Sequence, residues 1–125
     1  MQKIFLMSGA LAAALAVMIG AFGAHALKDF LTSNNRLETF ETAVKYHFYH
    51  ALGLLLIGIL INQKPSIWFN YAGYGLLVGM IIFSVSLYIL CLTNLKWLGA
   101  ITPLGGLAMI IGWICLFIGV YKENF

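Results

Sequence analysis

Three histidines are the side chains of this 125-residue sequence with the clearest capacity for chemistry. All of them lie between positions 25 and 50, as His25, His47 and His50. Imidazoles bind transition metals and haem iron, and they titrate near neutral pH. The same stretch holds most of the acidic residues of the chain, namely Asp29, Glu38 and Glu41. No other part of the sequence concentrates polar groups in this way, so we take this stretch as the candidate functional region.

Helical geometry separates the charges of this stretch from its imidazoles. A helix advances by about 100° per residue. Glu38, Glu41 and Lys45 then fall within about 60° of one another, whereas His47 and His50 fall on roughly the opposite face, beside apolar residues. We therefore predict that the charges face water and that both imidazoles face the interior of a helix bundle.

The histidines admit one structural and three functional interpretations. In the structural one, each imidazole bonds a backbone carbonyl, a hydroxyl or a neighbouring tyrosine. The first functional hypothesis is a transition-metal site of His25, His47 and His50 with a carboxylate. The second is haem ligation between helices by His25 and His50, with Tyr46 as a further candidate for cofactor binding. The third is a proton-linked or lipid-headgroup site, since ionisable residues within a membrane mark candidate functional sites.

The composition places these residues in an integral membrane protein. Of the chain, 62% is apolar and 9% is charged, and the mean hydropathy is +0.97, whereas soluble domains are about 45–50% apolar and 25% charged. The few basic residues form no stripe for nucleic acid. No nucleophile–base pair, phosphate loop or carboxylate dyad is visible. These observations exclude a soluble enzyme and favour a noncatalytic protein.

Four long stretches without Lys, Arg, Asp or Glu can each cross a bilayer, which takes about 20 apolar residues. They predict spans near 4–26, 40–62, 67–92 and 97–120, the second of which extends the short uncharged run 46–63 backwards past Lys45 and Glu41. The first stretch also has features of a signal peptide, but its apolar run exceeds the 7–15 residues of a signal core. We therefore predict an all-α, antiparallel four-helix transmembrane bundle that forms a single domain over residues 1–125.

Local sequence signals suggest how these spans begin and bend. The polar run Thr32–Asn35 is expected to cap the N-terminus of the second span, which starts near Arg36 with a wet first half. Pro103 predicts a kink or a loosened first turn in the fourth span. Cys91 and Cys115 differ in depth by about 24 Å along an antiparallel hairpin, so they are not expected to form a disulfide.

Small residues recur at helical spacing in two of the predicted spans. In a bilayer, such stripes let helix backbones approach closely. We expect both to be packing seams, one of which could remain exposed and join copies of the chain in a homo-oligomer. The seams are Gly9, Ala13, Ala16, Gly20 and Gly23 in the first span, and Gly105, Ala108, Gly112, Cys115 and Gly119 in the fourth.

The number of spans predicts that both termini lie on one side of the membrane. The basic residues then divide into three on the side of the termini and four on the other side. Cytoplasmic loops carry an excess of Lys and Arg, and this division is too even to assign the orientation. The two groups are Lys3, Lys64 and Lys122, and Lys28, Arg36, Lys45 and Lys96.

Several strings resemble the YgdD-like family of small membrane proteins, a domain of unknown function (DUF423, UPF0382). They are GAFGAHALK at 20–28, FETAVKYHFYHALGLL at 40–55, SIWF at 66–69, FSVSLYIL at 83–90, TPLGG at 102–106 and GW at 112–113. The likeness covers nearly the whole chain and implies a multi-pass protein of the bacterial cytoplasmic membrane with no assigned activity. It also implies that Gln can replace His47, which weakens the three-histidine metal site and leaves His25 and His50 as the better pair.

We therefore expect a noncatalytic role in membrane organisation, or in binding a lipid or a membrane protein partner, without a resident cofactor. The alternative is a redox protein that binds haem or a transition metal, or a small proton-linked transporter. Either alternative would use His25 and His50.

Overall fold

Four long helices and one short helix make up the protein, in a computed structural model that describes residues 1–125. The long helices are α1 (Gln2–Ala24), α3 (Leu37–Gln63), α4 (Ile67–Thr93) and α5 (Leu98–Lys122), and the short one is α2 (Lys28–Ser33). The long helices have the length and composition of membrane spans. The all-α, four-span prediction is confirmed, with bounds within about three residues of those expected.

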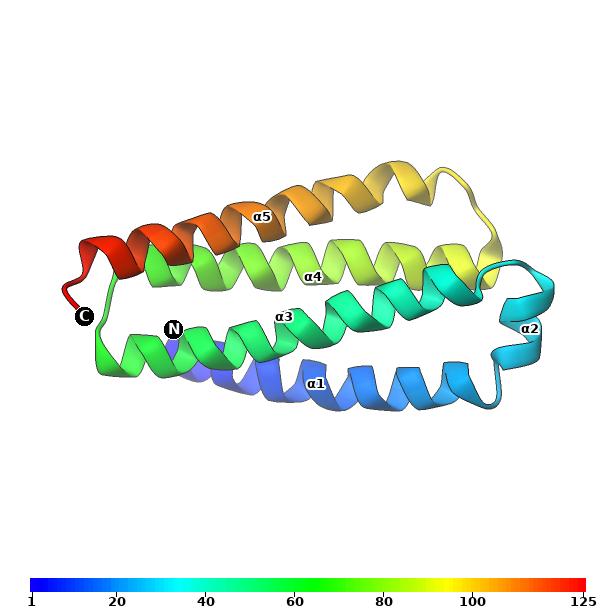
Figure 1. Cartoon of the computed structure of the whole chain (residues 1–125), viewed down its shortest axis with the longest axis horizontal. Coiled ribbons are helices and arrows are strands. Elements are labelled where there is room, and N and C mark those ends of the chain that lie inside the picture. Colours follow the sequence, from blue (N-terminus) through cyan, green and yellow to red (C-terminus); the bar gives the residue numbers. More distant parts are fainter.

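The long helices alternate in direction and pack in chain order, so α1 and α5 lie at opposite edges of the bundle (Figure 1). The two middle helices are accordingly the more enclosed. The most apolar segments of α3 and α4 are 39% and 44% buried, against 22% and 28% for α1 and α5. Both chain termini lie at one end of the bundle, and α2 lies at the other end (Figure 1).

Glycines bring the helix backbones together at both edges of the bundle. A Cβ atom added to Gly112 of α5 would lie 2.9 Å from the Leu76 nitrogen and 3.0 Å from the Ala72 oxygen of α4. On α1, a Cβ at Gly9 would lie 2.9 Å from the Ala51 oxygen of α3. Both predicted seams thus pack against helices of the same chain. The expectation of an exposed seam is wrong, because intramolecular packing uses both.

The connection between α1 and α3 differs from its sequence-based prediction. The hydroxyls of Thr32 and Ser33 do not cap α3 but donate to carbonyls within α2. Arg36 precedes α3 without any side-chain cap bond. The extra helix buries Leu31 completely, in a cluster with Phe40 of α3. This tertiary contact explains why the polar run closes α2 instead of opening α3.

Helix α5 runs through Pro103 without interruption. The turn before it is held by bonds between residues three apart, including Leu98 N–H to the Leu95 carbonyl at 3.1 Å. This is the tighter 3₁₀ pattern that is common at helix ends. Proline is therefore accommodated near the start of α5, where the helix has few preceding turns to distort. Cys91 and Cys115 are both free thiols.

Comparing Gly112→Ala with Gly106→Ala tests the close contact between α4 and α5. Both substitutions gain the same helix propensity, but the Cβ at Gly106 would meet only Phe83, at 3.9 Å. Gly112→Ala is expected to lower the unfolding free energy by about 1–3 kcal/mol relative to Gly106→Ala, through overpacking. Unfolding in detergent, followed by tryptophan fluorescence, measures the difference. Equal stabilities would contradict the close approach.

Candidate functional site

His50 joins α3 to α5 through both of its ring nitrogens. The indole N–H of Trp113 donates to His50 Nε2 at 3.0 Å, and His50 Nδ1 bonds the Tyr46 carbonyl at 2.7 Å. An indole nitrogen only donates and a carbonyl only accepts. The imidazole is therefore the neutral tautomer with its proton on Nδ1. In this arrangement neither nitrogen is free to bind a metal ion or haem iron.

Aromatic rings surround this imidazole. The Tyr46 ring stacks on His50 with centroids 6.0 Å apart, and the Trp113 ring meets it edge-on at 5.8 Å. Phe83 of α4 lies 4.9 Å from Tyr46. These residues line a hollow of about 360 Å³ between α3 and α5. The rings enclose His50, which is only 5% exposed.

His47 makes a corresponding connection from α3 to α4. Its Nδ1 atom lies 2.8 Å from the Tyr88 hydroxyl oxygen, and the tautomer decides which of the two donates. The two rings meet edge-on, with centroids 5.9 Å apart. His47 is 8% exposed. The prediction that both imidazoles face the interior is confirmed, and the two point to different neighbouring helices.

Hydroxyl groups make further polar contacts between helices in the same half of the bundle. Ser84 of α4 donates to the Ala43 carbonyl of α3 at 3.0 Å. Ser86 of α4 and Thr102 of α5 share a hydrogen bond of 2.7 Å, and Thr102 also donates to the Leu98 carbonyl. Every buried side-chain nitrogen and oxygen has a partner. The buried polar side chains thus hold the helices together.

His25 lies apart from the other two histidines. It is exposed at the C-terminal end of α1. Its neighbour Gly23 packs against Phe40, which places His25 near the first turn of α3. His50 lies ten residues beyond Phe40, or about 15 Å along the helix. The structure therefore brings together neither the predicted haem pair nor the predicted metal ligands, and no group of three His, Cys, Asp or Glu residues could hold a metal ion.

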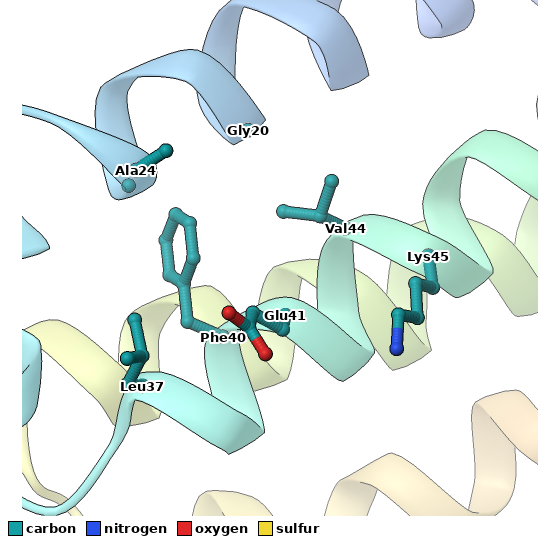
Figure 2. A pocket seen from close by; sticks show the side chains of 8 residues that line it. Gly20, Ala24, Leu37, Phe40, Glu41, Val44 and Lys45 are labelled. Atoms are coloured by element: carbon teal, nitrogen blue, oxygen red, sulfur yellow. The ribbon is translucent and has the colours of Figure 1, made fainter.

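A small hollow lies beside the charged face of α3, between α1 and α3. Its volume is about 200 Å³. Figure 2 shows Phe40 and Val44 pointing towards α1, whereas Lys45 points away from it. The glycines of α1 leave the space, and its wall is mainly apolar. The lining residues are Gly20, Gly23, Ala24, Leu37, Phe40, Glu41, Val44 and Lys45.

Comparison with known proteins identifies the relatives of the chain. A model of the family described as protein of unknown function (DUF423) matches residues 19–106. The chain belongs to the DUF423 family. Members named UPF0382 membrane protein from Staphylococcus saprophyticus and Staphylococcus epidermidis are 49% and 51% identical over 97% of this chain, and the match covers 99% and 98% of their length.

A relative from another genus also matches the chain over nearly its whole length. The UPF0382 membrane protein YwdK of Bacillus subtilis is 45% identical over 97% of this chain and 98% of its own. No solved structure matches the chain. The family is therefore one of uncharacterised membrane proteins, and the comparisons indicate no catalytic or other specific function for it.

The sequence predicted the kinds of partner that the two buried histidines have, a backbone carbonyl for His50 and a hydroxyl for His47, but it did not identify the partners on other helices. Trp113 is 63 residues from His50, and Tyr88 is 41 residues from His47. No local spacing rule connects residues at such separations. The available signal was that both partners lie in strings shared with the DUF423 family, together with Ser84, Ser86 and Thr102.

A double-mutant cycle between His50→Leu and Trp113→Phe tests the bond between α3 and α5. Interhelical hydrogen bonds in membrane proteins contribute roughly 0.6–2 kcal/mol, so we expect a coupling energy of about 1 kcal/mol. Unfolding in detergent provides the four free energies. The control cycle replaces Trp113→Phe by Trp97→Phe, an exposed tryptophan, and should be additive. A coupling equal to that of the control would contradict the bond.

Proposed function

We propose that the protein has a noncatalytic role in organising the membrane, which it exerts by binding a lipid. The observation that carries this proposal is that the buried groups with chemical capacity are engaged within the chain. His50 has both nitrogens bonded, His47 pairs with Tyr88, and the buried hydroxyls connect helices. A catalytic acid, base or nucleophile needs freedom to act on a substrate. The exposed faces of the membrane-spanning helices are mainly apolar.

The geometry gives less support to the cofactor-binding and proton-linked alternatives. Both would use His25 with His50, but Phe40, beside which the end of α1 packs, is about 15 Å from His50 along α3. Ligation by His50 would also break its bond to Trp113 and leave an indole N–H unpaired within the protein. The proposal therefore includes no resident haem or metal ion. Binding to a membrane protein partner is compatible with the same apolar faces.

We further propose that the protein lies in the bacterial cytoplasmic membrane with both termini on the same side. The support is that four helices can span a bilayer and that both termini lie at one end of the bundle (Figure 1). The relatives that are named membrane proteins come from bacteria.

Native mass spectrometry and an absorption spectrum of the purified protein test the noncatalytic proposal. Protein released from a mild detergent should carry a phospholipid mass and show no Soret band, because His50 cannot ligate haem while bonded on both nitrogens. His25→Ala should leave the retained mass unchanged. A Soret band that disappears on His25→Ala or His50→Ala would support the redox alternative. Bare protein without any retained lipid would overturn the lipid-binding role.

Cysteine labelling in cells tests the shared side of the termini. In a Cys91→Ser, Cys115→Ser background, Lys3→Cys and Glu123→Cys should react with a membrane-impermeant maleimide in the same way. Lys96→Cys, in the turn between α4 and α5, should behave oppositely, because an odd number of spans separates it from each terminal position: one from Glu123 and three from Lys3. Opposite reactivity of the two terminal positions would refute the topology.

A further inference from the structure

A long apolar slot runs between α1 and α4, with α3 beneath it. Two adjoining hollows of about 320 and 460 Å³ form it, and both contact Ile19 of α1 and Tyr88 of α4. We call them together the α1–α4 slot. Apart from the His47–Tyr88 pair and two serines, its walls are apolar. The larger wall residues include Leu11, Leu15, Met18, Leu77, Ile81 and Leu92.

Phe5 packs between α1 and α4 just beyond the end of the slot that lies near the chain termini, and we infer that it closes this end. Its side chain is fully buried, and its ring meets Tyr74 of α4 edge-on at 5.2 Å. It also fills the space above Gly73, where an added Cβ would lie 2.3 Å from the ring. The slot begins one turn further along, at Ser8 and Leu77. It therefore has a closed inner end and an outer end near α2.

The part of the slot between Tyr88 and Leu77 is about as deep as the hydrocarbon layer of one leaflet. The uncharged part of α3, residues 46–63, is about 27 Å long, close to the hydrocarbon thickness of about 30 Å. One hydrocarbon boundary therefore lies near Lys45, and the His47–Tyr88 pair lies just inside it. Leu77 is eleven residues before Tyr88 on α4, or about 16 Å deeper. Half of the hydrocarbon core is about 15 Å.

The volume of the slot suits a single extended chain and not a helix. The hollow between Ser8 and Tyr88 has a volume of about 320 Å³ over about 16 Å of depth. A helix segment of that length, about 10 Å across, occupies more than about 1,000 Å³, so the slot does not hold a whole helix of a second copy. The molecules that surround this part of the protein are lipids, because the slot opens sideways between two membrane-spanning helices.

We propose that the α1–α4 slot binds one acyl chain of a phospholipid from the leaflet on the α2 side. The carboxyl end of the chain lies near the His47–Tyr88 pair, at the polar edge of the hydrocarbon, and the methyl end lies near Phe5. This inference rests on the proposed lipid-binding function and specifies its site. An acyl chain in the slot makes van der Waals contacts with Leu15 and Ile81, which these side chains lack when the slot is empty.

Two slot-filling substitutions and one matched control test the site. Ile81→Trp on α4 and Leu15→Trp on α1 fill the slot from opposite walls. Ile111→Trp on α5 makes the same change at an equally exposed mid-helix position, since Ile81 and Ile111 are 50% and 51% exposed. Each full-length variant is reconstituted into nanodiscs that contain phosphatidylglycerol. The protein is then released, and native mass spectrometry quantifies the complex of one protein with one lipid. Thermal unfolding of the same samples checks that each variant is folded.

We expect each slot-filling variant to reduce the one-to-one complex about tenfold, equivalent to about 1.4 kcal/mol, while Ile111→Trp retains it. If wild-type protein and all folded variants retain lipid equally, the slot assignment is wrong, although lipid binding stands. If wild-type protein retains none, the proposed function itself fails. Should one slot variant not fold, the variant on the opposite wall decides the question.

A separate NMR experiment tests the direction in which the acyl chain lies in the slot. Phospholipids with a nitroxide near the carboxyl end of the acyl chain should broaden NMR signals of Tyr88 more than those of Leu77. A nitroxide near the methyl end should broaden Leu77 more strongly. The reverse pattern, or equal broadening by both lipids, would overturn entry from the leaflet on the α2 side.

Discussion

The absence of water in the hydrocarbon core constrains this protein more than any other factor. Polar groups there must find partners within the protein, and lipid tails provide no hydrophobic drive for helices to associate. The chain meets both conditions with few residue types. Glycines such as Gly9 and Gly112 bring backbones into contact, and hydroxyl, imidazole and indole groups pair between helices. The four long helices take their positions from these contacts.

Helix α3 illustrates how few side chains this arrangement requires. Its small residues receive α1, while His47 and His50 extend to α4 and α5 respectively. The bond from His50 to Trp113 is notable because α3 and α5 are not adjacent in the packing order (Figure 1). One helix thereby contacts all the other spans, and the two edge helices keep wide lipid-facing surfaces.

This use of polar residues bears directly on function. In a soluble enzyme, a buried histidine that is paired with a tyrosine is often part of a reactive site, whereas here the imidazoles connect helices. The proposed function therefore rests on the apolar surfaces of the protein. A slot that is closed by Phe5 and bordered by the His47–Tyr88 pair gives one such surface a defined shape and depth.

The sequence alone determined the number of spans, their approximate bounds and the inward-facing sides of His47 and His50. These properties depend on bilayer thickness and helical periodicity, which act over short stretches of chain. Only the tertiary structure decided the pairing of His50 with Trp113, the separation of His25 from His50, and the formation of α2 around Leu31. Each depends on contacts with residues on another helix. Small-residue stripes likewise predict that a helix packs closely, but the three-dimensional arrangement determines which helix it meets.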